Sequence, residues 1–264
     1  MHPIERLRWI ALEREEATAT LAAEAAWTLS ELAAEDPAAV VTACRRLVES
    51  HGTAGPLWWV AATLLVAPDP QTAARRAVDE LLSDPTADLL AEVLGERLGS
   101  GAVIVVACPA ETVRDALSQA SLSAVRIVGA LPGRRAEQRR FAAVVREVSD
   151  WDLDEADDAV QGATLVLLEA LAAGPAGVLV ASGIGDLVSA ARAASVPLWA
   201  VVGVGRVLHA QLLEEMLRRA DGKLELIAPD SIQVVIGPSG PGTPVEGLGR
   251  QPCPRAPELM VRAS

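Results

Sequence analysis

Five short apolar runs in the second half of the chain constrain the fold more than any other feature. They are AVIVVA (102–107), AVRIVGA (124–130), TLVLLEA (164–170), GVLVAS (177–182) and PLWAVVG (197–203). Runs of this length are typical of buried strands, and amphipathic segments at 110–120, 134–148 and 185–194 lie between them. Strands that alternate with helices form parallel sheets. The sequence therefore predicts an α/β protein with a Rossmann-like parallel sheet that contains all five runs.

The first hundred residues carry the signals of helices. Three Asp-Pro pairs each place a side-chain acceptor before a proline at the first helical position, namely Asp36-Pro37, Asp69-Pro70 and Asp84-Pro85. The apolar spacing predicts a helix from Pro3 to about Ala34, broken near Thr18 to Thr20, and another from 37 to 50 with Cys44 on its apolar face. We therefore expect a helical N-terminal region over residues 1–98, followed by the Rossmann-like domain over 99–264.

The end of the chain differs in composition. After LELIAPDSIQVVIG, the segment PSGPGTPVEGLGRQPCPRAP is rich in proline and glycine. These residues disfavour regular structure, so we expect an ordered extended tail or a flexible loop.

Composition excludes several classes of protein. The 264 residues are 51% hydrophobic, enough for a sizeable core, yet no uncharged apolar stretch of about 18 residues predicts a membrane span. The start, MHPIERLRWIALEREE, lacks the apolar region of a signal peptide, so we expect a cytoplasmic protein. A net charge of −12 with scattered arginines argues against a direct nucleic-acid partner. Three cysteines without a C-x-x-C pair predict reduced thiols, and we expect neither a metal nor a cofactor.

The loop at 107–112 is the first candidate site. Ligands bind at the carboxyl ends of parallel strands, where helix N-termini hold anions through free amides. A thiol at such a terminus is activated, so Cys108 is a candidate nucleophile or acid, and Thr112 is a candidate ligand-binding residue. The alternative is that Cys108 packs as a small strand-end residue.

The loop ASGIGD at 181–186 is the second candidate site. Gly183 and Gly185 would let the backbone approach a ligand, with Ser182 as a further contact. Asp186 is a candidate catalytic residue, although an aspartate at a helix start is also an ordinary cap, and the glycines alone also fit a tight turn.

Charged residues beside these loops complete the candidate site. Glu169, after a predicted strand, could act in acid–base chemistry or be a solvated residue at a helix start. Arg206 could bind a phosphate, as could Arg134 and Arg135, or all three could be surface residues.

The order of these segments resembles one known superfamily. VIVVACPAETVRDAL, AVRIVGALPGRR, TLVLLEALAAGPAGVLVASG and SVPLWAVVG follow a helical first half. The chain resembles the initiation factor 2B-like superfamily, which includes the alpha, beta and delta subunits of that factor and the isomerases of methylthioribose 1-phosphate and ribose 1,5-bisphosphate.

The resemblance implies that catalytic residues of the isomerases are missing here. Their threonine-histidine-cysteine-asparagine loop is matched at Cys108, but Ala107 replaces the histidine. Residues 181–183 lie where their glycine-alanine-aspartate motif is expected, without its catalytic aspartate. Gly185-Asp186 resembles the glycine-threonine pair that ends their asparagine-lysine-x-glycine-threonine motif, whose phosphate-binding lysine is missing. An arginine-proline-threonine segment expected near 51–56 has lost its arginine.

These observations leave three hypotheses. The leading one is a non-catalytic or repurposed relative that binds a small phosphorylated metabolite, such as a sugar phosphate or nucleotide, or that acts as a regulatory or assembly subunit, as a homodimer. The alternative is a sugar-phosphate aldose–ketose isomerase with a remodelled site, with Cys108 as the acid and Glu169 or Asp186 as the base. A third is a scaffold that uses Trp58, Trp59 and Trp151 as interface anchors.

Overall fold

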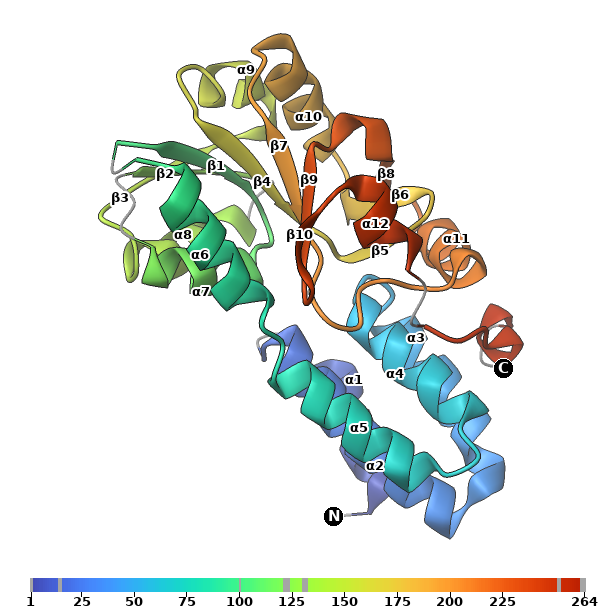
Figure 1. The fold of residues 1–264 in the computed structure, drawn as a ribbon. Helices are drawn as coiled ribbons and strands as arrows, with labels where there is room; N and C mark the ends of the chain where they lie inside the picture. The colour runs from blue at the N-terminus through green and yellow to red at the C-terminus, as the bar shows by residue number, and fades with distance from the viewer. Residues whose placement is uncertain are drawn as a thin grey trace.

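The computed structural model describes residues 2–13, 16–99, 101–120, 124–129, 133–250 and 253–261. A helical region at one end of the molecule joins a sheet region at the other (Figure 1). The last described residues return to the helical region, so that the segment near the C-terminus lies beside α3 and α11.

Five helices form the helical region: α1 (Pro3–Leu12), α2 (Thr18–Glu35), α3 (Val40–Ser50), α4 (Gly55–Val66) and α5 (Pro70–Leu82). The first predicted helix forms as α1 and α2, with the break that the sequence indicated, but α1 already ends at Leu12 and α2 begins at Thr18, so the break lies before the expected position.

The Asp-Pro pairs mark helix starts in different ways. Asp69 caps α5 as predicted, because its Oδ1 accepts hydrogen bonds from the N–H groups of Gln71 and Thr72. Asp84 accepts from the N–H of Thr86, the first residue of α6 (Thr86–Arg97). Asp36 makes no capping bond, and a short 3-10 helix (Pro37–Ala39) leads into α3.

The main sheet has seven strands in the order β10-β9-β7-β4-β1-β2-β3. The bounds are β1 (Val103–Ala107), β2 (Ala124–Val128), β3 (Glu147–Trp151), β4 (Leu165–Glu169), β7 (Leu198–Val201), β9 (Val234–Gly237) and β10 (Gly240–Gly242). All neighbouring strands pair in parallel except β10, which pairs antiparallel with β9. The predicted α/β fold with a Rossmann-like sheet is confirmed.

Helices cover both faces of this sheet. On one face, Ile104 and Val106 pack against α6, α7 (Glu111–Gln119) and α8 (Gly133–Ala142). On the other, Val105 and Ala107 belong to a core shared with α9 (Ala156–Ala159) and α10 (Ile184–Ala193). This alternation along β1 explains why its sequence is apolar without interruption.

One predicted parallel strand lies elsewhere. The run at 177–182 forms β6 (Gly177–Ala181), which pairs antiparallel with β5 (Ala172–Gly174) and β8 (Leu224–Ile227) in a separate three-stranded sheet. The prediction was wrong because the turn between β5 and β6 is too short for the crossover that parallel strands need.

Two further predictions need correction. The helix predicted over 134–148 ends at Ala142, and β3 begins at Glu147, where one exposed residue and four half-buried ones, EVSDW, give no apolar run. The proline- and glycine-rich end is neither an extended tail nor a plain loop, because it contains β10, α12 (Pro244–Gly249) and a 3-10 helix (Pro257–Met260). Helix α11 (Ala210–Arg219) and 3-10 helices at Leu153–Glu155 and Pro229–Ser231 complete the described elements.

Candidate functional site

The order in which strands are added to the seven-stranded sheet reverses between β1 and β4. From β1 the chain builds outward through β2 and β3 on one side, while β4, β7 and β9 extend the sheet on the other. Open α/β sheets bind ligands in the crevice that such a reversal leaves at the carboxyl ends of the strands. Cys108 follows β1 and Glu169 ends β4, so both lie at this crevice.

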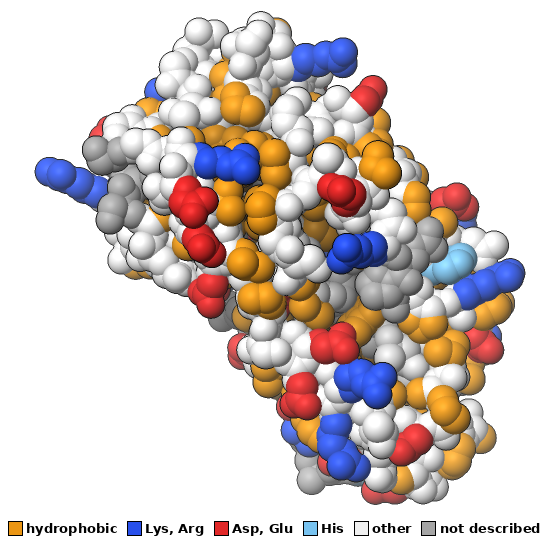
Figure 2. All heavy atoms as spheres, viewed as in Figure 1, with side chains coloured by type: hydrophobic (Ala, Val, Ile, Leu, Met, Phe, Trp, Pro, Cys, Tyr) orange, Lys and Arg blue, Asp and Glu red, His pale blue; other side chains and the backbone are white. Residues whose placement is uncertain are grey.

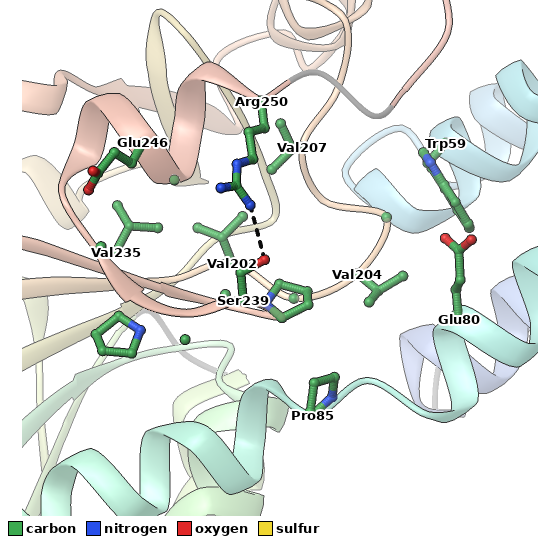
Figure 3. A pocket seen from close by; sticks show the side chains of 18 of the residues that line it. Trp59, Glu80, Pro85, Val202, Val204, Val207, Val235, Ser239, Glu246 and Arg250 are labelled. Carbon is green, nitrogen blue, oxygen red and sulfur yellow. Dashed lines mark hydrogen bonds between the residues drawn. The ribbon is translucent and has the colours of Figure 1, made fainter.

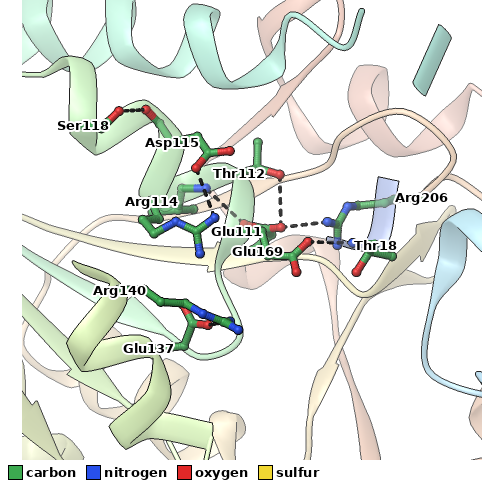
Figure 4. Close-up of polar contacts among 11 residues, drawn as sticks. Thr18, Glu111, Thr112, Arg114, Asp115, Ser118, Glu137, Arg140, Glu169 and Arg206 are labelled. Atoms are coloured by element: carbon green, nitrogen blue, oxygen red, sulfur yellow. Dashed lines mark hydrogen bonds and ion pairs between the residues drawn. The ribbon is translucent and has the colours of Figure 1, made fainter. Parts of the chain in front are cut away.

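The carboxylate of Glu169 is buried and surrounded by donors (Figure 4). It accepts hydrogen bonds from the N–H of Val113 at 3.0 Å, from the hydroxyl of Thr112 at 3.1 Å and from Nη2 of Arg206 at 2.7 Å. With 3% of its side chain exposed, Glu169 is not the solvated residue that one interpretation of the sequence expected. Its carboxylate lies at the start of α7, where free amides would otherwise attract an external anion.

Burial and charge act in opposite directions on this group. Burial has the larger effect and raises the pKa of the Glu169 carboxyl above its usual range, although the Arg206 guanidinium and the Val113 N–H favour its ionised form. Because the carboxylate has three donors within hydrogen-bond distance, it is paired as a buried charge must be. Thr112 and Arg206, both predicted to bind a ligand, therefore bind Glu169 in this structure.

Arg206 comes from the loop after β7 and is almost completely buried. Its guanidinium is 10% exposed, and Nη1 donates to the carbonyl oxygen of Ala170. The interpretation of Arg206 as a surface residue is therefore wrong. Arg135 is exposed, and the side chain of Arg134 lies outside the described residues.

A small cavity adjoins this ion pair between the helical region and the sheet. Its volume is about 210 Å³ and it is lined by Glu13, Glu16, Thr18, Leu21, His51, Thr53, Ala54, Leu57, Pro109, Leu171 and Arg206. This volume lies below the roughly 300–1,000 Å³ of typical ligand sites. The N–H of Thr18, which starts α2, donates to Glu111 at 3.1 Å, so a second helix N-terminus beside the cavity also has a carboxylate partner.

Cys108 packs in the apolar core rather than in this cavity. It is 9% exposed and belongs to the cluster on the face covered by α6, α7 and α8. Its N–H donates to the carbonyl oxygen of Val128 at 2.9 Å, and a Cβ at Gly129 would lie 2.9 Å from the Cys108 Cβ. The thiol-bearing residue is thus held closely between β1 and the end of β2.

The glycine loop is built around a different carboxylate. Gly183 has φ of +94°, and the N–H of Gly185 donates to Glu225 on β8. Ser182 and Asp186 are exposed. Among the described residues, no hydrogen bond or ion pair joins this loop to Glu169, Thr112 or Arg206. The structure therefore does not combine the two predicted loops into one polar site.

Sequence reasoning missed two carboxylates that organise these loops. Glu225 binds the start of α10, and Asp84 accepts from the N–H of Val204 at 2.7 Å beside the Arg206 loop. The Asp84-Pro85 pair was visible as a helix start, but a contact across 120 positions leaves no local signal. Only the pairing of β6 with β8 brings Glu225 to its place.

The tryptophans proposed as interface anchors have different environments. Trp58 is fully buried and Trp59 is 5% exposed, so both belong to the core of the helical region. Trp151 is half-buried, with the Arg126 guanidinium carbon 5.9 Å from its ring centroid.

Comparison with solved structures identifies the fold. Translation initiation factor eIF-2B from Pyrococcus horikoshii OT3 superposes with a TM-score of 0.74 over 93% of this chain and 98% of its own, at 15% identity. The chain has the fold of initiation factor 2B subunits. The resemblance inferred from the sequence is thereby confirmed at the level of the fold.

Two further structures support the same conclusion. The tetrameric beta2-delta2 complex of eIF2B from C. thermophilum matches with a TM-score of 0.71 and 19% identity, over 94% of this chain and 92% of that chain. The 5-methylthioribose 1-phosphate isomerase from P. horikoshii OT3 matches with a TM-score of 0.63 and 16% identity, over 92% of this chain and 84% of that chain. No family model and no curated protein matches at the level of sequence.

Two searches within the described part of the chain gave negative results. None of its helices combines the length and apolarity needed to cross a membrane. Nor do its His, Cys, Asp and Glu side chains form a group of three that could hold a metal ion.

Proposed function

We propose that this chain is a non-catalytic relative of the sugar-phosphate isomerases that acts as a binding, regulatory or assembly subunit. The observation that carries the proposal is the position of Glu169. Its carboxylate accepts hydrogen bonds from the N–H of Val113, the hydroxyl of Thr112 and the guanidinium of Arg206. These are the donors that an anionic substrate would need for binding.

The arrangement of the candidate catalytic residues supports this proposal. Aldose–ketose isomerisation needs an acid and a base placed on adjacent carbons, each worth about 10²- to 10⁴-fold in rate. Cys108 packs in an apolar core, Glu169 is bound to Arg206, and Asp186 is exposed on a loop with other contacts. None of the three residues lines the small cavity between the helical region and the sheet.

An assembly role is supported by the comparisons. The matching structure from C. thermophilum is a tetrameric complex of beta and delta subunits. We therefore propose that this chain forms a homodimer, and light scattering on the purified protein measures its mass directly.

The second candidate function is binding or isomerisation of a sugar phosphate in the small cavity. Arg206 lines that cavity together with His51 and Thr53, which is the observation in its favour. The phosphate would have to displace Glu169 from Arg206, and Glu13 and Glu16 at the same cavity would oppose its charge.

A turnover assay separates the two candidates. The purified protein is incubated with 5-methylthioribose 1-phosphate and with ribose 1,5-bisphosphate, and the products are followed by NMR. We expect no conversion above that of the buffer. Conversion that is lost in Cys108→Ser and in either Glu169→Gln or Asp186→Asn would establish the isomerase instead, and Asp157→Asn, at an exposed residue of α9, is the matched control.

A further inference from the structure

A second and larger cavity opens at the same edge of the sheet, on the side of β7, β9 and β10. Its volume is about 930 Å³, within the range of sites that hold small molecules. It lies at the carboxyl ends of β7 and β9, and the edge strand β10, helix α12 and residues of α4 and α5 enclose it (Figure 3). Figure 2 shows hydrophobic side chains in the hollow at the middle of this face.

One wall of this cavity is the loop 203–205 after β7, which is fixed from behind. The N–H of Val204 donates to Asp84 Oδ2 at 2.7 Å. Gly205 has φ of +76°, and a Cβ there would lie 3.2 Å from the ring of Trp59 and from Pro56. The loop can pack so closely on Trp59 only because residue 205 is glycine. This wall is therefore in place before any ligand arrives.

The opposite wall is equally dependent on glycine. A Cβ at Gly247 would lie 2.6 Å from the side chain of Val235, so only glycine lets α12 lie directly on β9. Val235 and Val202 contribute buried methyl groups to the lining, and the prolines of β10 and its turn extend the apolar surface. The interior is therefore suited to the body of an apolar ligand.

The polar groups are few and lie at defined places. The guanidinium of Arg250 points into the cavity and Nη1 donates to the hydroxyl of Ser239 at 3.2 Å (Figure 3). This is its single hydrogen bond within the part of the chain that the structure describes. A guanidinium has five N–H donors, so Arg250 can still bind a planar carboxylate with two parallel hydrogen bonds.

Two carboxylates line the same cavity and limit the charge of the ligand. Glu80 lies beside Trp59, and Glu246 accepts hydrogen bonds from the N–H and hydroxyl of Thr243. A dianionic phosphate would be repelled by both more strongly than a monoanionic carboxylate.

We propose that this cleft binds a small amphipathic carboxylate. Its apolar body lies between loop 203–205 and Val235, and its carboxylate is held by Arg250 and Ser239. The proposal goes beyond the function proposed above, since none of the groups around Glu169 belongs to this cleft.

The test uses two probes that differ only in charge. Binding of 1-naphthaleneacetate and of its neutral amide, 1-naphthaleneacetamide, is measured by isothermal calorimetry on the full chain. For a ligand of this size we expect a Kd on the order of 1 mM or tighter for the carboxylate. Arg250→Gln should weaken the carboxylate about tenfold and leave the amide unchanged. Arg192→Gln, an exposed arginine on α10, should change neither.

A second variant tests the place of binding. Val207→Phe fills the cleft from its lining and should abolish binding of both probes. The proposal is overturned if the carboxylate fails to bind, or if it binds equally to the unmodified protein and Arg250→Gln. It is also overturned if light scattering shows that a second copy covers the cleft, with Val207→Phe dissociating the dimer. If Val207→Phe does not fold, the comparison of the two probes in Arg250→Gln still decides.

Discussion

At the scale of single residues, Glu169 replaces an external anion with an internal one. Its carboxylate satisfies the first turn of α7 and neutralises Arg206 at the position where α/β sheets bind ligands. Because Glu169 is attached to the fold, it has a high effective concentration at Arg206 and the start of α7, which favours it over a free metabolite that would bind there. The residue therefore joins β4, α7 and the loop after β7, and under the proposed function it competes with phosphates for this site.

The Glu169–Arg206 pair should be strongly coupled in stability. Glu169→Ala and Arg206→Ala each leave a buried charge without its partner, so each should lower the free energy of unfolding by about 3–5 kcal/mol. Since both variants remove the same interaction, the double variant should cost less than the sum of the two. Urea denaturation of the four proteins checks this, and exact additivity would show that the two side chains do not depend on each other.

Glu215 should make stability sensitive to acid. Hydrogen bonds from Arg218 and Arg219 lower its pKa against the effect of burial. A folded-state pKa below the unfolded value of about 4.3 contributes stability above that pH, and the contribution is lost as the pH falls through the folded pKa. Glu215→Gln should cost roughly 1–3 kcal/mol at pH 7.

The pH series provides the internal control for that variant. The difference between the unmodified protein and Glu215→Gln should start to shrink as the pH falls below about 4.3, where the unfolded state takes up a proton, and it should level off below the folded-state pKa, where both folded proteins carry a neutral side chain at residue 215. A difference that is constant from pH 7 to pH 3 would contradict the assignment.

The sequence allowed prediction of the residues at the crevice but not of their partners. Cys108 and Glu169 follow apolar runs, and the topology of parallel sheets brings such positions together. That Glu169 binds Arg206, 37 positions away, depends on the path of the loop after β7. Contacts between distant segments of this kind leave no periodicity or motif in the sequence.

At the scale of elements, the hairpin from β5 to β6 diverts the chain away from the main sheet. Gly177 has φ of +139°, and a Cβ there would lie 2.2 Å from the carbonyl oxygen of Ile227 on β8. This close approach lets the small antiparallel sheet form. The sequence allowed prediction of β6 as an apolar strand. Its antiparallel direction depends on the short turn after β5, which the sequence does not distinguish from a connection between parallel strands.

Gly177→Ala should therefore destabilise the protein by about 1–3 kcal/mol, because the backbone is strained and β8 must move. The matched control is Gly95→Ala in α6, where a Cβ meets no atom within 4 Å. There the substitution should stabilise by about 0.5–1 kcal/mol. Thermal unfolding measures both, and equal shifts in Tm of the same sign would contradict this account of the hairpin.

At the scale of the whole molecule, the end of the chain connects its two regions. Arg45 of α3 and Arg219 of α11 donate to the carbonyl oxygens of Glu258 and Leu259 at 2.8 and 2.6 Å. Leu259 is fully buried in the core of the helical region. Composition alone predicted a tail here, because the segment is rich in proline and glycine and has few apolar residues. Those few, such as Leu259, nevertheless anchor it in the core.

Leu259→Ala should lower the free energy of unfolding by about 2–5 kcal/mol, since it leaves a cavity beneath the terminal segment. Val261→Ala, at a side chain that is 56% exposed, should change it by less than about 0.5 kcal/mol. Chemical denaturation checks both, and a Leu259→Ala protein as stable as Val261→Ala would show that the terminal segment is not part of the core.

If Glu169 occupies an anion site, its removal should open that site to inorganic phosphate. Thermal unfolding is measured with and without inorganic phosphate for the unmodified protein, Glu169→Ala, and the double variant Glu169→Ala with Arg206→Ala. We expect phosphate to raise the Tm of Glu169→Ala alone, since a ligand at about 100 times its Kd adds roughly 2.7 kcal/mol. An equal rise in the unmodified protein, abolished by Arg206→Ala, would show that the site is open to anions and would contradict the account.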